Sequence, residues 1–241
     1  MREKQARAGG GMTAPGGGFA RVLGSRTISA LVLIALTAAP SAALETTLEW
    51  RAGKETVIYT ETLRAENQGF VAVITTTAGE YDSLSLDGRL STLEWRRRVA
   101  AEGTDLVALR QGSKVRIEGT HKGKPYSRTL DFGDLPWYQF QELSYEEIFR
   151  AGARESAFWT IDRETLAPSL FRARRGGSSV IEVMGGPVEA IGYDLTVGGV
   201  PAFLFTSRVW LRESDGRFLR LDVPPVFNLP RSRVELTREK R

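Results

Sequence analysis

The sequence predicts an all-β protein, in which an antiparallel curved sheet or open (half) barrel of about ten strands carries one short helix. Three observations support this fold class. Apolar and polar residues alternate with a period of two along most of the chain after residue 43, and glycine-containing turns separate the alternating runs. Only one segment has the pattern of a helix start. Of the 241 residues, 41% are hydrophobic and 26% are charged, which is typical of a globular protein.

The alternating runs are expected to be strands that bury one face and expose the other, as in antiparallel sheets. In the first run, Glu61 falls on the same face as Val57 and Tyr59. The apolar positions of the later runs are Val71 and Val73, Val115 and Ile117, Ile191 to Val197 at every second residue, Val209 and Leu211, and Leu219, Leu221 and Val223.

Three dipeptides between these runs are typical of two-residue hairpin turns, because Gly and Asp tolerate the positive φ that such turns need. They are Asp87-Gly88, Gly198-Gly199 and Asp215-Gly216. We therefore expect consecutive strands to pair in up-and-down order.

One segment departs from the period of two and predicts a helix over 144–151. Ser144 is the candidate N-cap, and Glu147, three residues later, completes a capping box. Gly152 is expected to end the helix.

Residues 1–43 have the pattern of a secretory signal peptide that is cleaved after Ala43. Basic residues precede an apolar run over 28–39, which is shorter than the roughly twenty residues that cross a membrane. Two alternatives stay open, namely that Met12 is the true start and that the segment remains as an N-terminal anchor. We expect an exported protein, located in the periplasm, that does not span the membrane after cleavage.

The rest of the chain is expected to form one domain over 44–223, since no linker or shift in composition interrupts it. Residues 224–241 begin with Pro224-Pro225 and end in a charged stretch, and we expect them to form a tail. Whether this tail adds an edge strand over 233–237 or hangs free stays open.

The charge and the residue content exclude several classes of function. Five of the 33 basic residues and one of the 29 acidic residues precede residue 44, so the remaining chain is formally neutral and no nucleic-acid partner is expected. The chain has no Cys and one His, His121, which excludes thiol catalysis, disulfides and a multi-histidine metal site. We expect no metal and no cofactor.

The remaining catalytic alternative is a hydrolase that uses carboxylates alone, to which Asp82, Asp131 or Asp134 would contribute. The neighbours Glu146 and Glu147 are better explained by the start of the helix than by paired catalysis. Nothing in the spacing of these acids selects a catalytic pair, and we expect a protein that is not an enzyme.

The most informative cluster is aromatic and surrounds the expected helix. The candidate ligand-binding residues are Trp137, Tyr138, Phe140, Tyr145 and Phe149. Aromatic side chains bury large areas and dominate interfaces, so the cluster is expected to act as a lid or plug over an apolar groove. The alternative is a helix that closes the core and binds nothing.

Four arginines, Arg174, Arg208, Arg212 and Arg220, fall on the polar side of their alternating runs. If adjacent strands align them, one face of the sheet is basic and contacts an anionic group such as a phosphate or a lipid headgroup. The alternative is a solvated face that deters edge-to-edge aggregation.

Two stretches resemble bacterial exported domains of unknown function. Residues 158–168, with Asp-Arg-Glu-Thr-Leu-Ala-Pro, resemble a strand–turn–strand element of those domains, and residues 193–221, with Val-Gly-Gly-Val-Pro and Ser-Asp-Gly-Arg, are similar to their closing hairpins. These domains in turn resemble the periplasmic lipoprotein-carrier-like superfamily, in which an incomplete antiparallel barrel covers an apolar cavity lidded by several helices. The resemblance implies a Gram-negative periplasm and a half-barrel, and it assigns no catalytic residue.

These observations favour a non-enzymatic exported domain that binds an apolar or amphiphilic ligand, a lipid or an acylated partner protein, in a concave groove. The alternative is an envelope scaffold or protein-interaction domain that binds no small molecule.

Overall fold

The computed structural model describes residues 43–202, 205–225 and 230–240, which form one fourteen-stranded antiparallel sheet with one α-helix. The strands are β1 (Leu44–Ala52), β2 (Glu55–Glu66), β3 (Gly69–Thr76), β4 (Glu80–Leu86), β5 (Thr92–Val99), β6 (Thr104–Gln111), β7 (Lys114–His121), β8 (Lys124–Asp131), β9 (Glu155–Ile161), β10 (Pro168–Val183), β11 (Gly186–Val197), β12 (Ser207–Arg212), β13 (Phe218–Val223) and β14 (Ser232–Lys240). The helix α1 covers Gln141–Arg150, and a short 3-10 helix, η1, covers Ala100–Glu102. The predicted leader, apart from its last residue, lies outside the described residues.

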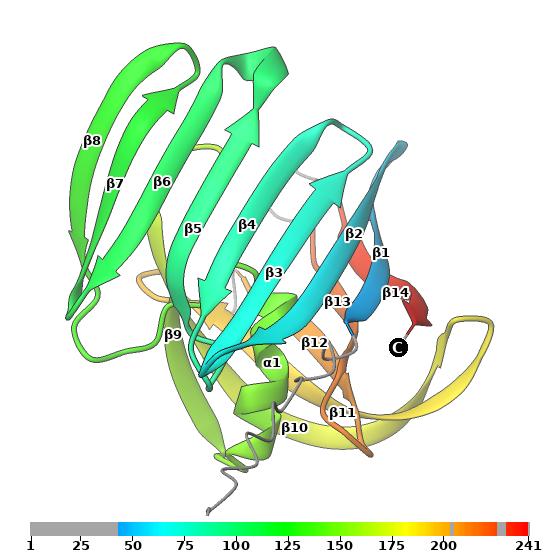
Figure 1. Ribbon diagram of the computed structural model, residues 1–241. Coiled ribbons are helices and arrows are strands. Elements are labelled where there is room, and N and C mark those ends of the chain that lie inside the picture. Colours follow the sequence, from blue (N-terminus) through cyan, green and yellow to red (C-terminus); the bar gives the residue numbers. More distant parts are fainter. Residues whose placement is uncertain (1–42, 203–204, 226–229, 241) are drawn as a thin grey trace, which may run out of the picture. The chain divides into compact units, whose positions relative to one another are not determined.

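The first and the last strand of the described chain pair with each other in the middle of the sheet. The strand order is β8-β7-β6-β5-β4-β3-β2-β1-β14-β13-β12-β11-β10-β9, and Trp50 of β1 lies opposite Val234 of β14. Every other pair joins strands that follow one another along the chain, which confirms the predicted up-and-down order. The two edge strands, β8 and β9, are therefore also consecutive in sequence (Figure 1).

The sheet is curved and does not close (Figure 1). The chain between the edge strands includes α1 and is hydrogen-bonded to β9. Trp137 of this connection forms an isolated parallel bridge with Trp159 of β9, and the Trp159 indole donates a 3.0 Å hydrogen bond to the carbonyl oxygen of Phe132. The connection after β8 thus satisfies part of the exposed edge of β9, which an open sheet would otherwise leave free to aggregate.

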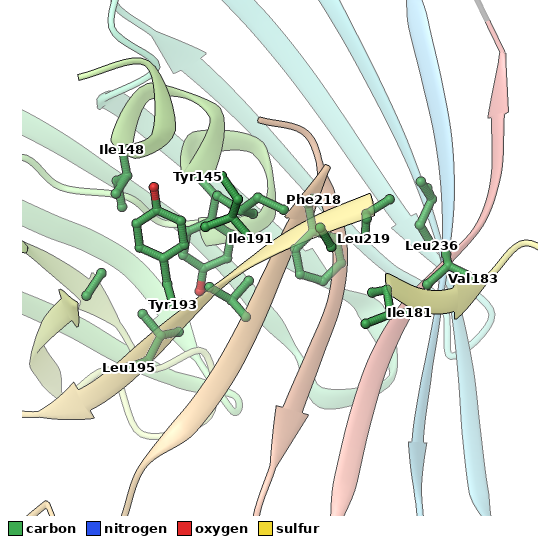
Figure 2. Packing of buried hydrophobic residues seen from close by; sticks show 14 of the residues in the cluster. Tyr145, Ile148, Ile181, Val183, Ile191, Tyr193, Leu195, Phe218, Leu219 and Leu236 are labelled. Atoms are coloured by element: carbon green, nitrogen blue, oxygen red, sulfur yellow. The ribbon is translucent and has the colours of Figure 1, made fainter. Parts of the chain in front are cut away.

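The buried side chains form two hydrophobic clusters. The first joins α1 to β9–β14 and includes Tyr145, Tyr193 and Phe218 (Figure 2). The second joins β3–β8 to the connection after β8 and includes Trp95 and Trp137. Each fully buried large apolar side chain contributes about 1.5–3 kcal/mol to the stability of the fold. Because α1 contributes Tyr145 and Ile148 to the first cluster, the helix lies on the buried side of the sheet.

The prediction of a helix start at Ser144 is wrong. The helix begins after Phe140, three residues earlier than predicted, and the Ser144 hydroxyl donates a 2.9 Å hydrogen bond to the Leu90 carbonyl oxygen instead of capping the helix. A buried tertiary acceptor has replaced the local capping box. The end is close to the prediction, because Gly152 has φ +63° and its N–H donates to Phe149.

The all-β class with one short helix is confirmed, but the described residues contain more strands than the ten or so predicted. Two reasons account for the difference. Turns such as Asn67-Gln68 between β2 and β3 lack the dipeptides used as turn signals. In addition, Ser232–Lys240 of the predicted tail form the strand β14, so the strand alternative for 233–237 is correct, but this strand lies between β1 and β13 in the middle of the sheet rather than at an edge.

Within the described residues, no helix has the length and apolar content that crossing a membrane requires.

Candidate functional site

A hollow of about 310 Å³ opens beside the first turn of α1. Three parts of the fold contribute to its wall. They are the four central strands β1, β2, β13 and β14, the strands β9 and β10 with the turn between them, and the chain from Gln139 to Glu142. The volume lies at the lower end of the range typical of small-molecule sites.

One wall of the hollow is apolar. It consists of the side chains of Leu48, Trp50, Phe140, Phe171, Leu221 and Val234. The strand register explains how they meet, because Trp50 lies opposite Val234 and Val234 lies opposite Leu221. Pairing of the first and last strands therefore places apolar residues from distant parts of the sequence side by side.

Polar residues also line the hollow, and Arg163 is the cation among the described residues there. Arg163 Nη1 lies 3.2 Å from Glu80 Oε2 and 3.8 Å from Asp82 Oδ2, and Nη2 donates a 3.2 Å hydrogen bond to the Tyr59 hydroxyl. The guanidinium carbon lies 5.2 Å from the centre of the Phe140 ring. These contacts hold the guanidinium in place at the hollow.

A second arginine, Arg97, pairs with the same two carboxylates that Arg163 contacts. Arg97 Nη1 lies 3.0 Å from Asp82 Oδ2, and Nη2 lies 3.1 Å from Glu80 Oε1. The Trp95 indole donates a 2.7 Å hydrogen bond to the other Asp82 oxygen. The two arginines Arg97 and Arg163 thus balance the two carboxylates Glu80 and Asp82.

Three carboxylates line the hollow: Glu61 of β2, Glu142 of α1 and Asp162 of the turn after β9. Asp162 accepts hydrogen bonds from the N–H groups of Glu164 and Thr165 within its own turn. Glu61 is 3% exposed, and its Oε2 accepts a 3.1 Å hydrogen bond from the Thr46 hydroxyl on the neighbouring strand. Burial, together with the charge of Glu142, raises the pKa of Glu61 to about 8. Burial also raises the pKa of Glu142. At neutral pH the pair therefore holds a proton that two solvent-exposed glutamates would not.

The five aromatic residues predicted to bind a ligand do not form one surface. Phe140 lines the hollow. Trp137 and Tyr145 are fully buried, one in each hydrophobic cluster. Tyr138 borders a separate hollow of about 530 Å³, and Phe149 packs, partly buried, against the first cluster. Four of the five thus contribute to packing or to another surface, as the core-closing alternative describes.

The four predicted arginines lie on the polar face of the sheet, where each has a carboxylate partner. Arg174 Nη2 and Arg208 Nη2 lie 3.9 Å and 2.6 Å from Asp194. The other two are also paired: Arg212 with Asp215 and Glu239, and Arg220 with Asp222, at 2.7–3.0 Å.

The strand register places charged residues directly opposite one another in a row across the five strands β10 to β14. The row runs from Arg174 through Asp194, Arg208 and Asp222 to Arg233. Charges alternate along the row, so the face is not a concentrated basic surface.

The three acids suggested for hydrolysis do not share the hollow. Asp82 is buried against Arg97, Asp131 accepts a hydrogen bond from the Gly133 N–H in a turn, and Asp134 borders the second hollow. Neither Glu61 nor Glu142 was predicted from the sequence as a site residue. A usable signal existed for Glu61, since this acid falls on the apolar face of its alternating run. Nothing comparable marks Glu142, because acids are common in a first helical turn.

No family model matches this sequence, and no curated protein matches it. The structure is similar to that of a β-barrel-like protein of the domain of unknown function DUF1849 from Brucella abortus, with 10% sequence identity and a TM-score of 0.51 over 84% of this chain and 99% of that chain. A second solved structure that matches is that of a "putative lipoprotein" from Parabacteroides distasonis, with 9% sequence identity and a TM-score of 0.32 over 83% of this chain and 97% of that chain.

The first likeness shows the fold, and it confirms the expected similarity to a bacterial β-barrel-like domain of unknown function. The likeness to the lipoprotein-carrier-like superfamily stays a prediction.

Proposed function

We propose that this chain is an exported, non-enzymatic β domain that binds an apolar or amphiphilic ligand, or the acyl chain of an acylated partner, in the hollow beside α1. The observation that supports it is the hollow itself, which is lined by apolar residues that include Leu48, Trp50 and Val234 and by polar residues that include Arg163. Ligand sites are typically concave and mostly apolar, with a few polar groups that orient the ligand.

Export is supported by the leader pattern of residues 1–43, and the periplasm by the resemblance to half-barrel carriers.

Titration of the purified protein with Nile red, an uncharged apolar dye, tests the proposal. We expect a saturable increase in fluorescence, and competition by a palmitoylated peptide. Val234→Trp fills the hollow and is expected to weaken dye binding about tenfold or more, which corresponds to roughly 1.4 kcal/mol. Val180→Trp is the matched control, because Val180 is 61% exposed on β10; it should bind the dye as the unchanged protein does.

Circular dichroism verifies that both variants fold. Absence of saturable binding, or equal binding by the two tryptophan variants, would reject the hollow as a ligand site and favour an envelope scaffold without a small-molecule ligand.

A carboxylate-dependent hydrolase is the second candidate, because Glu61 and Glu142 line one hollow and have raised pKa values. General acids of glycan hydrolases have raised pKa values of this kind. Incubation with aryl glycosides and with peptidoglycan decides between the two proposals. Turnover that is lost in Glu61→Gln would make the protein a hydrolase, whereas no turnover together with dye binding supports the binding domain.

A further inference from the structure

The described residues that line the hollow of the proposed function include three carboxylates, Glu61, Glu142 and Asp162, and one cation, Arg163. Arg97 and Arg163 are matched by Glu80 and Asp82, at distances of 3.0–3.2 Å. Glu61 and Glu142 line the same hollow. Among the described residues, neither of these two carboxylates forms an ion pair with a Lys, Arg or His nitrogen, and the more distant charge of Arg163 does not offset the effect of burial on the pKa of either. The hollow therefore offers acceptors to a positively charged group.

Glu61 is the better defined of these acceptors. Its side chain is buried, and Thr46, directly opposite on β1, supplies a neutral hydroxyl to one of its two oxygens. Register places Leu48 opposite Tyr59, the next pair on the same face of these strands. The carboxylate thus lies at the end of the apolar wall rather than inside it. A buried carboxylate without a cation is costly and is neutralised either by a proton or by a bound cation.

Glu142 lines the same hollow from the first turn of α1. The amide groups at the start of a helix favour a negative charge there, so this carboxylate is held in place by its backbone as well as by packing. Two carboxylates that line one hollow repel each other, and a bound cation offsets that repulsion as a bound proton does.

We infer that the ligand is an amphiphile with a protonated amine as its head group, which contacts Glu61 and Glu142 while its apolar chain lies along Leu48, Trp50 and Val234. This inference rests on the proposed function and names the class of its ligand. An ammonium group donates up to three hydrogen bonds and is compact enough for a hollow of about 310 Å³. An anionic head group would add negative charge beside these two glutamates, and Arg163, the cation at the hollow, already pairs with Glu80 and Asp82.

In the described part of the chain, the side chains do not favour a metal ion over an organic ammonium as the bound cation. No group of three or more His, Cys, Asp or Glu side chains in the described part of the chain is placed to hold one. An organic ammonium, which needs no closed set of ligands, therefore fits the pair better.

Competition against Nile red at neutral pH tests the inference with dodecylamine, dodecanol and dodecanoate, which share one chain length and differ in head-group charge. We expect dodecylamine to bind about tenfold or more tightly than dodecanol, because hydrogen bonds between charged groups are stronger than those of a neutral hydroxyl. Dodecanoate should bind most weakly. These three titrations need no variant, so they remain decisive if a variant fails to fold.

Variants then locate the amine. Glu61→Gln and Glu142→Gln should each reduce the preference for dodecylamine over dodecanol, and the double variant should abolish it. Glu147→Gln is the matched control, since Glu147 lies on the same helix but pairs with Arg150 outside the hollow.

Equal affinity for the three amphiphiles, or an amine preference that survives in the double variant, would overturn the inference while leaving the proposed function intact. If none of the three displaces the dye and the dye itself does not bind, the proposed function fails instead.

Discussion

Arg163 donates a 3.2 Å hydrogen bond from Nη2 to the hydroxyl of Tyr59, and this contact joins the turn after β9 to strand β2. The guanidinium carbon also lies 5.5 Å from the centre of the Tyr59 ring. Tyr59 packs against both hydrophobic clusters. Since Arg163 also contacts Glu80 and Asp82, one side chain links the two halves of the sheet at the hollow proposed to bind a ligand.

The buried pair behind Arg163 is expected to contribute strongly to stability. Asp82→Asn removes one carboxylate from Arg97, which is 2% exposed, and should lower the free energy of unfolding by about 3–5 kcal/mol. Urea unfolding measures the change. The control is Asp105→Asn, which breaks the exposed pair with Arg98 and should cost less than about 1 kcal/mol. Equal effects of the two changes would contradict the role of burial.

The stability of the protein is expected to fall as pH rises from about 5 to about 8. Burial and the charge of Glu142 raise the pKa of Glu61 from 4.5 to about 8, so the folded state holds this proton more tightly than the unfolded chain does. The stability that depends on protonated Glu61 is therefore fully present below about pH 4.5 and is lost as pH approaches 8.

Glu61→Gln, which stays neutral at every pH, should flatten this decline in a series of urea midpoints. Glu102→Gln changes an exposed glutamate on η1 and should leave the slope unchanged. A decline of the same size in all three proteins would show that other groups cause it.

The turn between β12 and β13 is expected to require glycine at position 216. Gly216 has φ +74°, and a Cβ atom there would meet the ring of Phe149 on α1. Gly216→Ala should therefore cost more than the roughly 1 kcal/mol typical of a left-handed position. Gly112→Ala, at φ +62° with open space around it, measures the backbone part alone.

Truncation of the ring separates the two contributions to this cost. In a Phe149→Ala background, the penalty of Gly216→Ala should shrink to that of Gly112→Ala, which a double-mutant cycle from urea unfolding determines. An unchanged penalty would mean that the ring is not the obstacle.

The row of alternating charges on the polar face is expected to contribute little to stability. Arg208 is half-exposed, and its Nη2 lies 2.6 Å from Asp194. Arg208→Gln should lower the free energy of unfolding by less than about 1 kcal/mol, with a smaller effect at high salt. Nile red affinity should not change, because Arg208 does not line the hollow. A loss of affinity would instead support the predicted anionic-group contact on this face.

Turn positions were predicted more reliably from the sequence than turn lengths. Asp87-Gly88 does lie between two paired strands, but the connection runs from Asp87 to Ser91, where the Asp87 carboxylate accepts hydrogen bonds from the N–H groups of Arg89 and Ser91. The positive φ falls on Leu90 rather than on Gly88. A dipeptide signals that the chain reverses, whereas the length of the loop depends on the strand register on both sides.

For the helix as well, the features set by local sequence were predicted and those set by tertiary contacts were not. Its approximate place and its end near Gly152 were predicted, because the loss of the two-residue period and a glycine stop are local features. Its start was not predicted, because the Ser144 hydroxyl bonds to Leu90, which is distant in sequence. A cap forms only if no tertiary partner competes for the same hydroxyl.

By itself, the sequence determined that this chain folds as an antiparallel sheet of consecutive strands, because a period of two and glycine turns act over a few residues. Only the tertiary structure decided that Ser232–Lys240 joins β1 in the middle of the sheet and that Glu61 and Glu142 line one hollow. Those outcomes depend on pairing between segments far apart along the chain, and the register of such pairing is set by packing of the whole core rather than by any local pattern.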